Sequence, residues 1–229
     1  MNLFNSISHD LIDAWLQSGE MDGPETLYSK ILASLSIKMA VAVVTTAADD
    51  PYDWHFRRIK DFGFKSRMMD RLRGQFPNAS LRDLDRRFVD EAIVPTYSRV
   101  VEAQRPTIDL VRTKLLGIRI GYERLILPQK CSGKPGWCIS LTEGRYLIPP
   151  AQQMTVDMTD EGIIQLLIEG QTAREIADFL NLSPRTIEHR IDKMKLRLEA
   201  KNLVHLVAKL VATQLDRQTS PELVDEADA

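Results

Sequence analysis

Residues 172–198, TAREIADFLNLSPRTIEHRIDKMKLRL, decide the fold of the C-terminal part of this sequence. Thr172 and Ser183 each stand where a helix can begin, because a hydroxyl side chain accepts a hydrogen bond from a free N–H of the first turn. Pro184 follows at the first helical position, where its missing N–H costs nothing. Residues 181–183 leave room only for a tight connector between the two helices. This order predicts a helix-turn-helix.

The second of these helices is amphipathic. At about 100° per residue, Ile191, Met194 and Leu198 fall within ~40° of Ile187, so the four share one face that we expect to be buried. A helix buried on one side and polar on the other suits the major groove, where donors and acceptors read base edges while Lys and Arg meet phosphates. The opposite face carries Arg185, His189 and Asp192, flanked by Glu188 and Lys193.

The segments 170–177 (GQTAREIA) and 182–188 (LSPRTIE) resemble the LuxR-type (GerE-like) DNA-binding domain. Leu198, Lys201 and Asn202 continue the pattern, together with Leu206 and Val207 in the next helix. The resemblance implies a four-helix unit that docks its third helix in the major groove and often dimerises through its fourth. Three residues differ from the usual family pattern: Asp160 in place of Glu, Arg190 in place of His, and Asp192 where many members carry a basic residue.

Local charge agrees with a nucleic-acid partner. The segment 183–210 carries seven basic and three acidic residues, whereas the whole chain has a net charge of −2. A basic segment beside an acidic tail can indicate DNA binding, although a solvated helix face has the same composition. We expect double-stranded DNA to contact Thr172, Arg174, Arg185, Thr186, Glu188, His189, Asp192, Lys193 and Lys201.

The fourth helix carries more apolar surface than one buried face needs. A first stripe consists of Leu203, Leu206, Val207 and Leu210, and a second, about 100° away, of Val204, Ala208, Val211 and Leu215. Spare apolar stripes on small modules are often interfaces. The second stripe therefore predicts a homodimer; the alternative is that it packs on the N-terminal domain.

The N-terminal part mixes helix and strand signals. Two helices are expected in the first 38 residues, the second from Thr26 to Met39, and a longer helix from Asp83 to Gln104 with an interruption at Pro95. Between them, residues 40–45 and 54–59 read as strands and 65–73 as a helix closed by Gly74. After Pro106, alternating apolar residues predict two or three antiparallel strands, one of them running through Leu116.

That order resembles a PAS domain, a five-stranded antiparallel sheet with helices between its second and third strands. The likeness rests on residues 53–59 (DWHFRRI) and 122–128 (YERLILP) and covers roughly 35–149. We predict an α+β protein: a PAS-like antiparallel sheet domain, then an all-α four-helix helix-turn-helix DNA-binding domain. The expected divisions are a helical extension (1–34), a PAS-like sensory or dimerisation domain (35–149), the LuxR-type domain (150–215) and an acidic tail (216–229). Residues 149–153 are the expected linker around the second boundary.

Composition and scattered reactive residues argue against other classes. Hydrophobic residues make up 44% and charged residues 27%, as in soluble globular proteins. No apolar run approaches the roughly 20 residues of a membrane span, and the N-terminus does not resemble a signal peptide, so we expect a cytoplasmic protein. No catalytic residue, metal site or cofactor is predicted, because the four histidines are scattered and Cys131 and Cys138 stand in no reactive motif. The sequence leaves open whether the two cysteines pair.

The main interpretation is a sequence-specific DNA-binding transcriptional regulator whose PAS-like domain receives a small-molecule or protein signal. A phosphorylation receiver domain is rejected, because no second strand-end aspartate follows Asp49 and Asp50 at the required distance. Three alternatives stay open. They are an acyl-homoserine-lactone-type quorum-sensing receptor, a protein-interaction or anti-activator module that no longer binds DNA, and a haem- or flavin-dependent redox protein.

Overall fold

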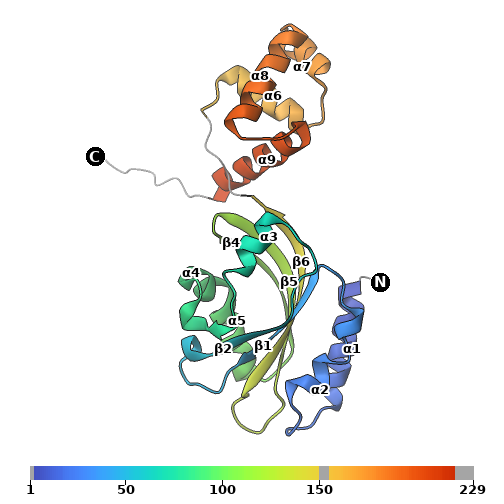
Figure 1. The fold of residues 1–229 in the computed structure, drawn as a ribbon, viewed down its shortest axis with the longest axis vertical. Helices are drawn as coiled ribbons and strands as arrows, with labels where there is room; N and C mark the ends of the chain where they lie inside the picture. Colours follow the sequence, from blue (N-terminus) through green and yellow to red (C-terminus); the bar gives the residue numbers. More distant parts are fainter. Residues whose placement is uncertain (1–2, 150–154, 220–229) are drawn as a thin grey trace, which may run out of the picture. The chain divides into compact units, whose positions relative to one another are not determined.

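The computed structural model describes residues 3–149 and 155–219, with side chains as far as Gln214. The chain divides into two compact units, Met1–Leu147 and Ile148–Ala229 (Figure 1). Most of the expected linker and tail, at 150–154 and 220–229, lies outside the described residues, as does the side chain of Leu215. The two units are therefore considered separately.

A six-stranded sheet forms the centre of the first unit. Its antiparallel neighbours follow the order β3-β2-β1-β6-β5-β4, so the first and last long strands of the chain lie side by side in the middle. Val41, Val43 and Val44 of β1 are buried in this central position, as expected from their apolar, β-branched side chains. The strands are β1 (Met39–Thr45), β2 (His55–Lys60), β3 (Ala79–Ser80), β4 (Thr107–Leu115), β5 (Ile118–Pro128) and β6 (Trp137–Ile148).

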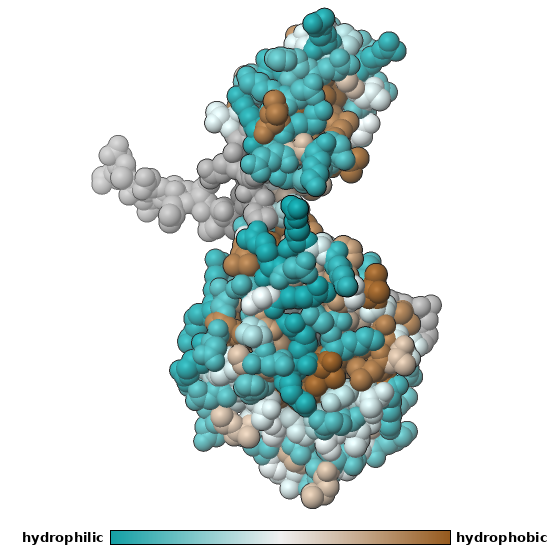
Figure 2. All heavy atoms as spheres, viewed as in Figure 1, coloured by the Kyte–Doolittle hydropathy of each residue, from teal (hydrophilic) through white to brown (hydrophobic). Residues whose placement is uncertain are grey.

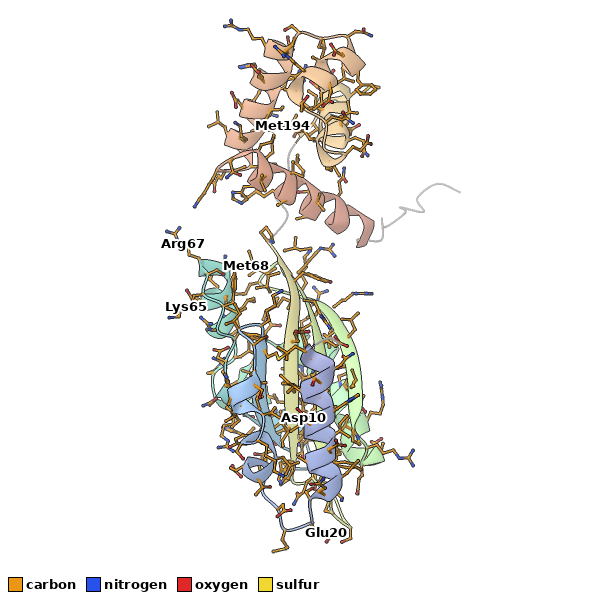
Figure 3. All side chains as sticks on the ribbon, turned by 90° about the vertical axis from the view of Figure 1, so that its right-hand side faces the viewer. Asp10, Glu20, Lys65, Arg67, Met68 and Met194 are labelled. Carbon is orange, nitrogen blue, oxygen red and sulfur yellow. The ribbon has the colours of Figure 1, made fainter. Side chains whose placement is uncertain are left out.

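Helices cover both faces of this sheet (Figure 1). On one face α1 (Leu3–Gln17) packs Phe4, Ile7 and Leu11 into a core with apolar residues of β1, β5 and β6. On the other, α3 (Arg67–Arg73), α4 (Arg86–Phe88) and α5 (Val94–Ala103) enclose a second core. Figure 3 shows α1 lying along the sheet. The helices inserted after β2 agree with the element order that the sequence predicted.

The helix expected from Thr26 to Met39 is wrong. The chain forms only the short α2 (Pro24–Tyr28) and a 3₁₀ turn at Leu32–Ser34 before β1 begins. Tertiary pairing explains the difference, because Met39 already lies opposite Glu143 of β6 and must be extended. The apolar spacing that suggested a helix instead comes from Leu27 and Ile31, which are buried beneath α1.

The strand expected to run through Leu116 is interrupted there by a tight turn. Leu116 and Gly117 have φ angles of 51° and 76° and form the two-residue connection between β4 and β5. Two consecutive positive φ values match the twist of the strands that they join. The alternation of apolar residues across this point therefore belongs to two strands that run in opposite directions.

The expected interruption at Pro95 is confirmed. Residues Val89–Ile93 form a π-helical turn between α4 and α5, immediately before the proline. A proline inside a helix removes one N–H and its ring clashes with the carbonyl four residues earlier. The widened turn accommodates both effects, so the chain stays helical from Arg86 to Ala103.

The described residues of the second unit from 155 to 219 form an all-helical domain, and the predicted α+β fold is thereby confirmed. Its core joins buried residues of all four helices, including Ile163, Ile176, Ile187 and Leu206. Asp157 accepts a hydrogen bond from the Asp160 N–H at 2.7 Å and so caps the first helix. The helices are α6 (Met158–Ile168), α7 (Ala173–Leu180), α8 (Pro184–Arg197) and α9 (Leu203–Thr219).

Candidate nucleic-acid interface

Local hydrogen bonds fix where α7 and α8 begin. The Ser183 hydroxyl accepts from the Thr186 N–H at 3.1 Å, as expected for a cap. Thr172 accepts from the Glu175 N–H, while the Glu175 carboxylate accepts from the Thr172 N–H at 2.7 Å, which completes a capping box. These bonds hold the pKa of Glu175 below its ordinary value of 4.5. Asn181 turns the chain between the helices with a φ of 52°.

The buried face of α8 is the one that the helical angles predicted. Ile187, Ile191, Met194 and Leu198 all belong to the core of the helical unit. Figure 3 shows Met194 among the surrounding helices. The opposite face of α8 is consequently turned outward, which is the first requirement for a recognition helix.

All nine expected DNA-contacting residues are exposed. Five of these side chains, all on α7 or α8, have no partner among the residues that the structure describes, and they leave donors and acceptors free for a ligand. Figure 2 shows that hydrophilic residues cover most of the visible face of this unit. The five are Arg174, Arg185, Glu188, His189 and Lys193.

The other four have partners within the protein or stand apart from α8. The Thr172 hydroxyl lies 2.7 Å from the Glu175 carboxylate, and the Thr186 hydroxyl 2.8 Å from that of Ser183. Asp192 forms an ion pair with Lys195 at 2.6 Å. Lys201 lies between α8 and α9, where its backbone N–H donates to His205.

Comparison with known proteins agrees with this geometry. Residues 159–210 match the family GerE, bacterial regulatory proteins, luxR family. These residues form a LuxR-type helix-turn-helix domain. The match begins inside α6 and ends inside α9, so it covers the four-helix arrangement. No curated protein matches the chain.

Several solved structures are similar to the chain at low identity. VqmA bound to DPO has 20% identity and a TM-score of 0.24, over 52% of this chain and 55% of VqmA. A Vibrio cholerae VqmA dimer structure has 15% identity and a TM-score of 0.27, over 56% of this chain and 61% of that one. Escherichia coli SdiA has 13% identity and a TM-score of 0.26, over 93% of this chain and 98% of SdiA. The matched part of this chain thus spans little more than half of the first VqmA structure.

Arg190 of the LuxR-type domain has a role that the sequence did not indicate. Its guanidinium donates to Asp157 at 2.8 Å and to Asp160 at 2.7 Å. The Arg190 hydrogen bond, followed by the Asp160 N–H, holds the pKa of Asp157 below 3.8. Two of the three departures from the family pattern, at positions 160 and 190, are therefore partners in one ion-pair cluster that joins α8 to the start of α6.

The apolar stripes of α9 differ in burial. In the first stripe Leu206 and Leu210 are buried, although Leu203 is exposed. In the second, Val204 is 80% exposed, Ala208 is exposed and Val211 is half-buried. The LuxR-type domain thus leaves most of the second stripe uncovered.

Two exposed apolar residues, one on α7 and one on α8, were not predicted. Phe179 of α7 is 66% exposed and Leu196 of α8 is 81% exposed. The helical angles could have identified Leu196, because it lies about 180° from Ile187 and so opposite the buried face. Apolar side chains on such a face can contact thymine methyl groups or sugars as well as another protein.

Groups capable of other chemistry are dispersed. Over residues 3–149 and 155–219, no cluster of His, Cys, Asp or Glu is arranged to hold a metal ion, and no helix suits a membrane span. Cys131 and Cys138 are both free thiols. Burial raises the pKa of Cys138 to about 12, so this thiol is unreactive at neutral pH.

Proposed function

We propose that this protein is a sequence-specific transcriptional regulator that binds double-stranded DNA as a homodimer. The observation that carries the proposal is the outer face of α8, where Arg185, Glu188, His189 and Lys193 are exposed without partners within a domain of the LuxR type. A regulator of chromosomal DNA works where that DNA lies, so we place it in the cytoplasm. The proposal assigns no enzymatic activity.

The exposed residues divide by chemistry into two groups. Arg185, Thr186, Lys193 and Lys201 are basic or hydroxyl-bearing and would contact phosphates, with Thr172 and Arg174 at the start of α7. Glu188, His189 and Asp192 would face base edges, because a carboxylate can accept from cytosine N4 but repels phosphate. The Asp192–Lys195 ion pair would have to open or rotate for Asp192 to take this role.

The first unit would act as a PAS-like sensory or dimerisation domain. Support comes from its five longer antiparallel strands, which lie in the order β2-β1-β6-β5-β4. The helices are inserted after β2 in the chain. A small molecule or a protein would be the signal. An acyl-homoserine-lactone-type receptor is a narrower version of the same proposal.

A protein-interaction module that no longer binds DNA is the competing proposal. The exposed carboxylates of Glu188 and Asp192 favour it, because acidic groups weaken contact with phosphate. Selection of random DNA by the full-length protein separates the two. We expect one enriched motif, whereas the absence of any motif over a range of salt concentrations would support the interaction module.

A further inference from the structure

The first unit contains a partly open cavity of about 520 Å³ on the side of the sheet that carries α3, α4 and α5. This volume lies in the usual range of small-molecule sites. Aromatic side chains are concentrated around it: five of the chain's seven phenylalanines and three of its five tyrosines line the walls. Aromatic residues are only 7% of the sequence, so the concentration is specific to this place.

Three of these rings pack against one another. Phe76 packs with its ring centre 4.9 Å from that of Phe88 in an edge-to-face arrangement and 6.4 Å from that of Phe56. Walls of this kind favour a flat aromatic guest, because ring pairs gain free energy in offset or edge-to-face contact beyond simple apolar burial. A guest with a flexible acyl chain would gain only the free energy of apolar burial.

The arginines that line the cavity already have carboxylate partners. Asp61 pairs with both Arg58 at 2.8 Å and Arg73 at 3.1 Å. Arg124, which is only 3% exposed, pairs with Asp109 at 2.6 Å.

Arg145 pairs with Glu143 at 2.9 Å, and Lys38 is exposed to water. The paired arginines would offer an ionised guest no free counter-charge and Lys38 stays hydrated, so such a guest would lose its own hydration in the interior without compensation. The charge arrangement therefore selects against carboxylates, phosphates and amines.

Tyr122 supplies a free polar group in this apolar space. Its hydroxyl has no hydrogen-bond partner among the described residues. Burial raises the pKa of Tyr122 to about 12, so the phenol keeps its proton at neutral pH. The cavity wall gives this hydroxyl no acceptor, so a guest with an acceptor atom would gain a hydrogen bond there.

We propose that this cavity binds an uncharged, flat aromatic small molecule that carries a hydrogen-bond acceptor for the Tyr122 hydroxyl. This inference rests on the sensory role proposed above for the first unit. It selects one class of signal, whereas the sequence left small molecules and proteins equally open.

The test measures binding of simple probes to the full-length protein by ligand-observed NMR. Quinoline and naphthalene have the same shape, but only quinoline has an acceptor nitrogen. The third probe, 2-naphthoate, adds a negative charge to the naphthalene ring. The fourth, octanoyl-homoserine lactone, has an acyl chain in place of the aromatic rings. We expect quinoline to bind about fivefold to tenfold more tightly than naphthalene. We expect 2-naphthoate and the lactone to bind more weakly than quinoline.

Tyr122→Phe removes the hydroxyl and keeps the ring. We expect this variant to bind quinoline about fivefold to tenfold more weakly than the wild type does. Its affinity for naphthalene should stay within about twofold of the wild-type value. Tyr146→Phe is the matched control, because Tyr146 also lines the cavity but is 39% exposed, and we expect it to change neither. Gly144→Leu should exclude both probes by filling the cavity, since a Cβ at Gly144 lies 3.7 Å from Phe62.

Three results would overturn the inference: no binding by any neutral aromatic probe, equal or tighter binding of 2-naphthoate or the lactone, or quinoline affinity that Tyr122→Phe leaves unchanged. Selection of random DNA by the wild-type protein is a separate measurement that does not depend on the probe-binding results. A motif without probe binding rejects the inference alone, whereas probe binding without a motif rejects the proposed DNA-binding function.

Discussion

Arg190 shows how one side chain can depart from a family pattern and still have a defined structural role. It joins α8 to the N-terminus of α6 through Asp157 and Asp160, whose side chains are 58% and 13% exposed. Because one end of this cluster is in water, its contribution to stability is modest. It holds α8 against the start of α6, so its guanidinium is occupied within the domain.

Replacing Arg190 by alanine should therefore lower stability in a pH-dependent way. The folded-state pKa of Asp157 lies below its ordinary 3.8, so this carboxylate stabilises the fold above pH 3.8 and loses that effect as the pH falls through the folded value. We expect Arg190→Ala to lower the Tm by a few degrees at pH 7, with a difference that shrinks toward zero below pH 3.8. Thermal unfolding followed by circular dichroism measures the Tm difference at pH 7 and below pH 3.8.

Arg185→Ala is the matched control for this prediction. Arg185 lies on the same helix, is exposed and has no partner in the described part of the chain. Its Tm should stay within about a degree of the wild type at both pH values. A pH-independent loss for Arg190→Ala would show that packing, and not the ion pairs, stabilises this contact.

Glu188 and Lys193 should affect DNA binding in different ways. Lys193→Ala should weaken binding about equally on all sequences and reduce the salt slope by roughly one unit. Glu188→Ala should relax the preference at one base position, by about 1–3 kcal/mol of discrimination. DNA selection and salt-dependent gel shifts with both variants distinguish these outcomes, and two variants with the same profile would contradict the division of roles.

At the scale of an element, the turn between β4 and β5 is held by an unsuitable residue. Leu116 has a φ of 51°, which costs a residue with a Cβ about 1–2 kcal/mol, and its side chain is 41% exposed. Asparagine tolerates this conformation and forms the preferred Asn-Gly turn with Gly117. Leu116→Asn should stabilise the first unit by about 0.5–1 kcal/mol.

Urea unfolding of the full chain checks this prediction through the transition of the first unit. Leu110→Asn provides the control, because Leu110 is similarly exposed at 52% but lies within β4. Asparagine is unfavourable in a strand, so this variant should be destabilised. Stabilisation by both substitutions would mean that loss of exposed apolar surface, and not turn geometry, is responsible.

The fourth helix of the LuxR-type domain is the element that we expect to dimerise. Along the second apolar stripe of α9, Val204 and Ala208 are exposed and Val211 is half-buried. Val211→Glu would place a charge in the interface at a cost of several kcal/mol, so the isolated domain should become monomeric. Gln214→Glu, on the same helix at an exposed position, should leave the dimer intact. Sedimentation velocity measures the oligomeric state of both variants. A Val211→Glu domain that stays dimeric would show that the stripe has another role.

Elements defined by local signals are predicted well from this sequence. Thr172 and Ser183 cap their helices with partners three residues away, so a short segment contains the whole cause. The boundaries of α7 and α8 and the buried face of α8 follow from such patterns. The helix expected at Thr26–Met39 fails because the pairing of β1 with β6, about a hundred residues apart, decides the conformation there.

The candidate sites show the same dependence on sequence distance. The exposed face of α8 could be found from a helical repeat, whereas the Arg190–Asp157 contact joins residues 33 positions apart. The cavity is built from residues between Ile37 and Leu147, and Tyr122 lacks a partner only because of how those residues fold together. No spacing within the sequence encodes that juxtaposition.

At the scale of the whole molecule, DNA recognition and the cavity belong to different units. The candidate contacts between Thr172 and Lys201 lie in the second unit, and the residues that line the cavity all lie in the first. The core of each unit consists of its own residues, so each has the means to fold without the other. Separating them should therefore separate their activities.

A fragment that ends at Pro150 should lose DNA binding, and a fragment of residues 151–229 should keep it. The second fragment should bind more weakly than the full chain, because it has only the uncovered stripe of α9 with which to hold two copies on adjacent half-sites. Gel shifts with the motif selected by the full-length protein make the measurement, and a folded circular dichroism spectrum of each fragment is the control. Specific binding by residues 1–150 would contradict the assignment, since it would place recognition in the sheet unit and leave the exposed face of α8 for a protein partner.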